Sequence, residues 1–95
     1  MVVGVCRISL MIHTSFSLKD KRSVLRRIKD RTRKKFNVSI AEVGENDIVN
    51  RALIGFVAVG NDRRHVNSTL DTVQQFIDEL YLAEILDAEL ELLNY

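Results

Sequence analysis

"RALIGFVAVGND", residues 51–62, is the stretch that decides the fold. Its first ten residues place β-forming apolar side chains at odd and even positions alike, which is typical of a central strand. Gly60 and Asn61 then break the strand, and Asp62 is a good N-cap for a helix. The stretch therefore predicts a central strand over residues 51–60 that leads directly into a helix.

The segments downstream of this strand predict one helix and one more strand. Apolar residues recur at helical spacing at positions 66, 70, 73, 77 and 80. The sequence AEILDAELELL, residues 83–93, then alternates between apolar and acidic positions, as an edge strand with one polar face does. We expect its apolar side to consist of Leu86, Ala88, Leu90 and Leu92.

The segments before residue 51 predict a strand, a helix and a second strand. NVSIAEV, residues 37–43, is a short strand, and GEND, residues 44–47, supplies a turn. A helix is predicted before the strand of residues 37–43, with Ser17 as its N-cap and Asp20 as the capping-box partner. Residues 2–12 alternate with one fully apolar side, which predicts the first strand.

The resulting order of elements is β-α-β-β-α-β, the split-βαβ or ferredoxin-like pattern of the α+β class. Right-handed crossovers then give a four-stranded antiparallel sheet in the order 4-1-3-2, with both helices on one face. The length of 95 residues suits a single domain, residues 1–95.

Composition excludes several classes of protein. The 46% hydrophobic and 28% charged residues are globular values, and no apolar run reaches the roughly 20 residues that span a bilayer. The single cysteine, Cys6, cannot form an internal disulfide, which fits a reducing cytoplasm. We find no phosphate-binding loop, no metal-ligand spacing and no catalytic constellation. We therefore expect a cytoplasmic protein without enzymatic activity, metal, cofactor or membrane contact.

Charge is distributed very unevenly along the chain. Residues 19–35 hold ten basic and two acidic side chains, a net +8 in a protein whose total is +1. At 3.6 residues per turn, one side of the predicted helix carries a continuous row of cations: Lys19, Arg22, Arg26, Lys29 and Arg33. Arginines one turn apart suit a phosphate backbone, so the row is a candidate RNA-binding site. The alternative is a solvated helix neutralised by acidic neighbours, such as the acidic last strand or a second copy, and both interpretations stay open.

A second group of polar residues is predicted at one end of the sheet. Lys21 lies on the apolar side of the first helix, and the topology brings His13, Glu42 and Asp47 to the same end. A lysine beside a helix N-terminus is a candidate anion or small-ligand site. The favoured alternative is a structural salt bridge, with the lysine stem packed under the loop near Phe16.

The face of the sheet without helices also has a predicted role. Val3, Val5 and Met11 lie on it beside one side of the central strand. An uncovered apolar patch of this kind predicts a homodimer, or a partner docked there. Arg7 lies on the same face and is expected to form cross-strand pairs with the acidic row of the last strand.

Four segments resemble one known family: SLKDKRSVLRRIKDR, KFNVSIAEV, NRALIGFVAV and NDRRHV. Together they are similar to the bacterial YlxP-like proteins, a family of small uncharacterised proteins, almost end to end. The resemblance implies a ferredoxin-like fold and a link to translation, because members are often encoded among translation and ribosome-maturation genes. It implies no catalytic residues, since no activity is established for the family.

Three hypotheses for the function follow from these observations. The leading one is an accessory protein whose basic helix contacts RNA phosphates, for example on a ribosomal particle. The second is a protein–protein or dimerisation module without a nucleic-acid role. The third is an anion or small-ligand sensor at the end of the sheet that holds His13 and Lys21.

Overall fold

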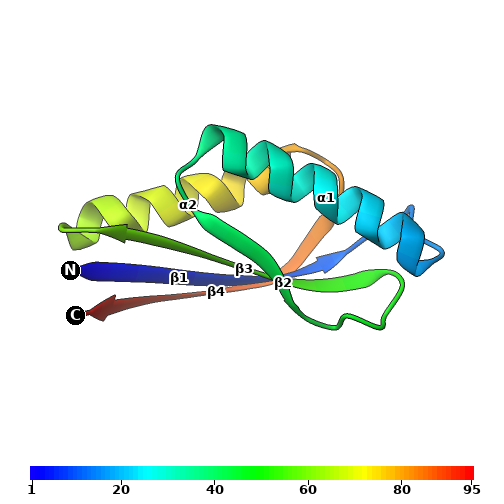
Figure 1. Ribbon diagram of the computed structural model, residues 1–95, viewed down its shortest axis with the longest axis horizontal. Coiled ribbons are helices and arrows are strands. Elements are labelled where there is room, and N and C mark those ends of the chain that lie inside the picture. The colour runs from blue at the N-terminus through cyan, green and yellow to red at the C-terminus, as the bar shows by residue number, and fades with distance from the viewer.

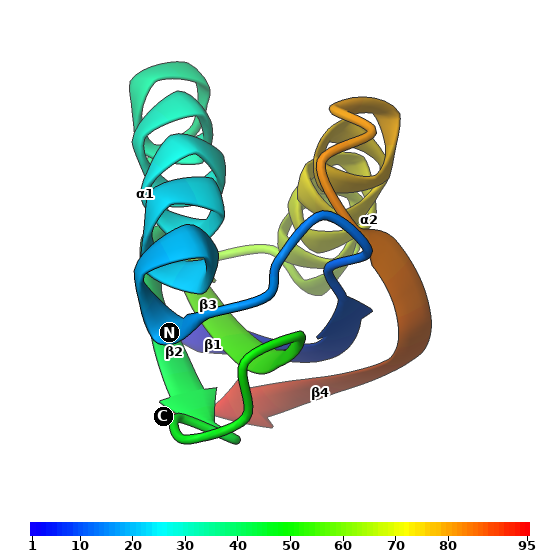
Figure 2. The same cartoon turned by 90° about the vertical axis from the view of Figure 1, so that its right-hand side faces the viewer.

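Four strands and two helices make up the computed structural model, which describes all 95 residues. Neighbouring strands are antiparallel in the order β2-β3-β1-β4, which is the predicted order seen from the other edge. Both helices lie on one face of this sheet (Figures 1 and 2), so the predicted fold is confirmed. The elements are β1 (Val2–Met11), α1 (Leu18–Lys35), β2 (Ser39–Gly44), β3 (Arg51–Gly60), α2 (Arg63–Glu79) and β4 (Glu84–Asn94).

The hydrophobic core lies between the sheet and the two helices. Alternate residues of β1 and β3, such as Ile8 and Phe56, are fully buried because they point toward the helices. The helices pack apolar stripes against these residues, including Ile28 on α1 and Leu70 on α2. All sixteen residues of the core cluster come from β1–β3, the two helices and Ile12, and none comes from β4. β4 is an edge strand that pairs only with β1, and it contributes partly buried side chains such as Ile85 and Leu92 to the margin of the core.

The two helices cover different halves of the sheet. In Figure 2, α1 stands over the β2 edge and α2 stands over the β4 side. The helices meet near one end, where the Phe36 and Phe76 rings pack edge to face with centroids 5.3 Å apart. α1 has its predicted N-cap, because the Asp20 N–H donates to Ser17 Oγ. The second half of the predicted capping box is shifted by one residue, since Asp20 Oδ2 accepts from the N–H of Phe16 and not from that of Ser17. No helix is both long enough and apolar enough to cross a membrane.

The last strand differs from its expected pattern in one place. The register between β1 and β4 shifts so that Ser9 pairs with Asp87 while Leu10 pairs with Ile85. Leu86 is the extra residue of this β-bulge. The strict alternation expected for residues 83–93 is therefore interrupted, with Ile85 packed against the core and Leu86 exposed.

At Gly4 the helix α2 packs directly against the backbone of the sheet. A Cβ at this position would lie 2.6 Å from both Leu70 Cδ1 and Val66 Cγ1, which are fixed in the core. We expect Gly4→Ala to lower the free energy of unfolding by about 1–3 kcal/mol, because overpacking forces the helix away from the sheet. Chemical denaturation measures this change.

Gly55→Ala is the matched control for Gly4→Ala. Its Cβ would meet only Val43, at 3.2 Å, and Val43 is exposed and free to move. The control should therefore cost less than the Gly4 variant. Equal stability of Gly4→Ala and the parent protein would contradict the close packing described here.

Candidate nucleic-acid interface

The predicted row of cations lies along one side of α1. We call Lys19, Arg22, Arg26, Lys29 and Arg33 the basic flank. Leu25 and Ile28 point into the core, and helical spacing places the basic flank about a quarter turn away from them. On the opposite side of the helix, Lys35 Nζ lies 5.0 Å from the Phe76 ring of α2. The basic flank therefore faces away from α2, on the side of the β2 edge.

Arg33, at the C-terminal end of the basic flank, contacts the sheet. One guanidinium nitrogen of Arg33 donates to the Ile40 carbonyl oxygen of β2 at 2.8 Å. The other lies 3.8 Å from an oxygen of Asp30, within the same helix. This contact fixes the position of the flank above strand β2 and uses part of the Arg33 side chain.

The rest of the basic flank has no carboxylate partner. The protein contains four ion pairs, and none of them involves Lys19, Arg22, Arg26 or Lys29. The Arg22 Nε–H donates only to the Leu18 carbonyl of the same helix. The acidic strand β4 does not neutralise the flank within one chain, because β4 and β2 form opposite edges of the sheet.

The length of the basic flank suits an extended polyanion. Arg33 lies fourteen positions after Lys19, which corresponds to about 21 Å along a helix. The cations follow one another at intervals of three or four residues, so each lies roughly one turn from the next. Like charges at this spacing repel one another slightly, and a bound row of phosphates removes that repulsion.

Lys21 is buried although it carries a charge. Its side chain is 1% exposed, and its ammonium group donates to the carbonyls of Glu45 (2.9 Å), Asn46 (3.1 Å) and Arg51 (3.2 Å). A carboxylate oxygen of Glu42 lies 3.0 Å from Lys21 Nζ and supplies the counter-charge. All three N–H donors of the lysine are therefore used inside the protein. Lys21 fastens the β2–β3 loop to the first turn of α1.

The four residues of the predicted anion site do not form one site. Lys21 and Glu42 form the buried pair, while His13 Nε2 lies 2.8 Å from Glu84 Oε1 on the surface near β4. Asp47 is exposed in the β2–β3 loop and takes part in no ion pair. No donor of Lys21 remains for a bound anion, so this group supports the structural alternative.

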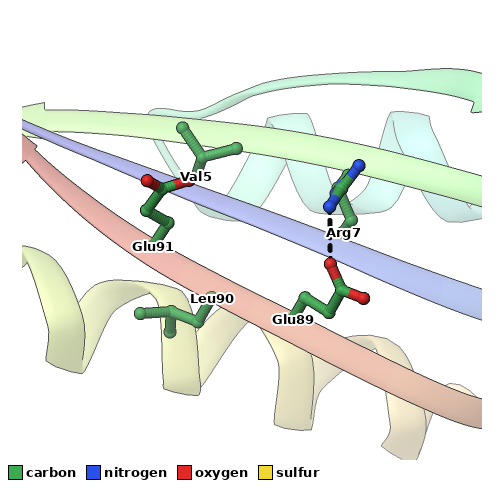
Figure 3. A pocket seen from close by; sticks show the side chains of 5 residues that line it. All are labelled: Val5, Arg7, Glu89, Leu90 and Glu91. Carbon is green, nitrogen blue, oxygen red and sulfur yellow. Dashed lines mark hydrogen bonds and ion pairs between the residues drawn. The ribbon is translucent and has the colours of Figure 1, made fainter.

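The uncovered face of the sheet, which we call the open face, is partly apolar and partly charged. Next to β2 and β3 it carries a hollow lined mainly by apolar side chains, including Val5, Leu53 and Val57, with Arg7 at one side. Toward β4 it carries Arg7, whose guanidinium lies 2.5 Å from Glu89, so the expected cross-strand pair is confirmed. Figure 3 shows this pair, with the Glu91 carboxylate beside Val5 and Leu90 on the other side of β4.

Cys6 takes part in neither surface. It is fully buried in β1, and burial, with a smaller contribution from the Asp71 carboxylate, raises the pKa of its thiol from 9.0 to about 11. The thiol therefore stays protonated at neutral pH, so Cys6 has the role of a small core residue that its position in the first strand predicts.

The exposure of Phe16 differs from the one expected from the sequence. Packing of the Lys21 stem near Phe16 is the expectation from sequence, yet the Phe16 side chain is 84% exposed. A signal for this exposure exists in the sequence. A hydrophobic residue before an N-cap usually packs against the fourth residue of the helix, and here that residue is Lys21 instead of an apolar one.

Two solved structures have a similar fold. The chain titled "De novo designed protein Foldit4" superposes with a TM-score of 0.53 and 13% identity, over 99% of this chain and 97% of that one. The chain titled "Structural Genomics, protein YJCS" superposes with a TM-score of 0.55 and 9% identity, over 97% of this chain and 99% of that one. At these identities the likeness concerns the fold alone, a two-layer α+β domain.

Comparison of sequences identifies the family. Residues 3–90 match the family described as "Protein of unknown function (DUF503)". The "Uncharacterized protein YlxP" of Bacillus subtilis (strain 168) is 40% identical over 77 residues, which are 81% of this chain and 84% of that protein. The chain therefore belongs to this family, and the resemblance to YlxP-like proteins is confirmed.

Proposed function

We propose that this protein is a cytoplasmic, non-enzymatic accessory protein that binds RNA, for example on a ribosomal particle, through the basic flank of α1. The observation that carries the proposal is the lack of any carboxylate partner for Lys19, Arg22, Arg26 and Lys29. This row of like charges adds repulsion within one helix while the protein as a whole carries a net charge of only +1.

The form of the basic flank favours contact with the sugar–phosphate backbone over the reading of base sequence. Arginine binds phosphate through two parallel hydrogen bonds, and two of the four side chains without a carboxylate partner are arginines, Arg22 and Arg26. The open face of the sheet carries no aromatic side chain at its two middle strands, unlike RNA-recognition sheets that stack bases. Affinity through the flank is therefore expected to be largely independent of sequence.

A fluorescence anisotropy titration with a labelled single-stranded RNA tests the proposal. If four side chains meet phosphates, the logarithm of the association constant should fall with the logarithm of the salt concentration with a slope of about −3. Measurements at a series of salt concentrations between 50 and 200 mM, about the range over which this effect is large, give the slope. No binding at the lowest salt concentration would contradict the proposal.

A second function, self-association, is favoured by a separate observation. The open face leaves the side chains of Val5, Leu53 and Val57 partly exposed around a hollow, and no element of the chain covers them. Two copies packed through these faces would remove this apolar surface from water. This interface lies on the opposite side of the sheet from the helices, so it is compatible with RNA binding by α1.

Self-association through the open face predicts a change of mass on mutation. Light scattering of the parent protein should give about twice the 10.9 kDa of one chain. Val57→Lys should give the mass of one chain, because it replaces an apolar side chain that lines the hollow with a charged one. Ser68→Lys, on the exposed side of α2, is the control and should keep the parent mass. A single-chain mass for the parent protein would contradict this second function.

A further inference from the structure

Phe16 is presented to solvent on a piece of backbone that is hydrogen-bonded on both sides. Its N–H donates to Asp20 Oδ2 at 3.1 Å, which fixes it to the first turn of α1. The preceding residue, Ser15, is 3% exposed, and its hydroxyl lies 2.5 Å from the Val49 carbonyl of the β2–β3 loop. An exposed aromatic ring on a fixed backbone differs from one on a mobile loop, because little conformational entropy is lost when a ligand packs on it.

The packing of the neighbouring residues explains why the ring is not buried. The residue that would normally cover it is the fourth of the helix, Lys21, and that side chain is turned into the β2–β3 loop. Leu18 follows the N-cap and is itself partly exposed, so no apolar pocket for the ring forms at this end of α1. The contacts that hold Lys21 in the β2–β3 loop therefore also leave the Phe16 ring exposed to water.

Phe16 also lies at the start of the basic flank. Lys19 is three residues further along the chain, so the two α-carbons are separated by at most about 11 Å. Arg22 follows Lys19 one helical turn later. In Figure 1 this end of α1 is the right-hand end of the molecule, beside the β2–β3 loop.

We propose that Phe16 is a base-stacking platform and that the ligand of the basic flank is single-stranded RNA. This inference rests on the proposed function. A positively charged track combined with an exposed aromatic ring is the usual means of binding single strands, since every unpaired base offers a face for stacking. The bases of a duplex are already stacked on one another, so a duplex meets only the cations of the flank.

Two other aromatic side chains are highly exposed, and neither has such surroundings. Tyr81 is 85% exposed, but the surface hollow that it lines contains no lysine or arginine and no residue of the basic flank. Tyr95 is 76% exposed and lies at the C-terminus, at the opposite end of the molecule from the start of α1 (Figure 1). Phe16 alone combines an exposed ring with the cations of the basic flank.

Replacement of the ring tests the stacking contact. Phe16→Leu should lower the affinity for single-stranded RNA roughly fivefold to 150-fold, the range that corresponds to one lost base–aromatic stack. The slope of affinity against salt should stay that of the parent protein, because leucine changes no phosphate contact. Affinity for a duplex RNA of the same length should change less than twofold, or about the error of such a titration.

Tryptophan at the same position gives a second readout. The chain contains no tryptophan, so Phe16→Trp introduces a single fluorophore, and stacking of a base on it should quench its emission. Tyr95→Trp is the control and should keep its emission when the same RNA is added. If the parent protein binds RNA with the expected salt slope but Phe16→Leu binds equally well and Phe16→Trp is not quenched, the stacking inference is wrong while the proposed function stands. If the parent protein binds no RNA, both are wrong.

Discussion

Replacement of Lys21 by methionine should lower the free energy of unfolding by about 3–5 kcal/mol, the usual result of removing one partner from a buried ion pair. Methionine keeps most of the length of the side chain, so the loss comes from the ammonium group. Glu42 would keep its charge in a half-buried position without a counter-ion. The carbonyls of Glu45, Asn46 and Arg51 would lose their donor at the same time.

The measurement is thermal or chemical denaturation, and Lys19→Met is its matched control. Lys19 lies on the same turn of α1 but is exposed and has no partner, so its replacement should change stability by less than about 0.5 kcal/mol. For a domain of this size the loss at Lys21 corresponds to a fall in Tm of more than about 10 °C. A Lys21→Met protein as stable as the Lys19→Met control would show that the buried contacts of Lys21 contribute no net stability.

The double variant Lys21→Met/Glu42→Gln separates the two parts of this effect. Neutralising Glu42 removes the unpaired buried charge, so the double variant should be more stable than Lys21→Met alone. The remaining deficit belongs to the three carbonyls of the β2–β3 loop. If Glu42→Gln brought no recovery, the cost would lie in these carbonyl contacts and not in the ion pair.

Charge reversal of the basic flank should produce the largest change in RNA affinity. Each phosphate contact with a single strand raises the logarithm of the association constant by about 0.7 when the salt concentration falls from 1 M to 0.1 M. Loss of three contacts in Arg22→Glu/Arg26→Glu/Lys29→Glu should therefore weaken binding by about 100-fold at 0.1 M salt, and repulsion from the new carboxylates adds to this. The readout is the same anisotropy titration, with circular dichroism to confirm that α1 is intact.

A second triple variant of the same net charge is the control for this experiment. Arg27, Arg31 and Lys34 are exposed on the same helix, and helical spacing places them on sides of α1 other than the basic flank. Their reversal to glutamate should weaken binding by less than about tenfold, through long-range repulsion that salt screens. Equal losses in the two triple variants would mean that RNA responds to total charge and that no particular surface of α1 is the site.

The sequence predicts those features that depend on local periodicity. The alternation in residues 2–12 and the helical spacing of the apolar positions in residues 66–80 are properties of short segments, so the element order and the position of the basic flank follow from such patterns. The sheet order then follows from the rule that crossover connections are right-handed. The Arg7–Glu89 pair was also predictable, because both residues lie on the polar or open side of neighbouring strands.

The features that the sequence does not predict depend on how a loop or a ladder closes. The partners of Lys21 are backbone carbonyls of residues 45, 46 and 51, and no side-chain pattern records where carbonyls of a loop point. The exposure of Phe16 follows from the same contacts, because Lys21 is turned away from it. The bulge at Leu86 depends on the register that β1 imposes on β4, which the alternation within β4 alone cannot reveal.

Ultraviolet crosslinking of the protein to RNA, followed by mass spectrometry of the crosslinked peptides, tests most directly whether α1 is the RNA-binding surface. The RNA-binding function proposed here predicts crosslinks within residues 16–33, which contain Phe16 and the whole basic flank. It also predicts their loss in the Arg22→Glu/Arg26→Glu/Lys29→Glu variant. Crosslinks that fall instead on β4 or on the open face of the sheet, or that persist unchanged in that variant, would contradict it.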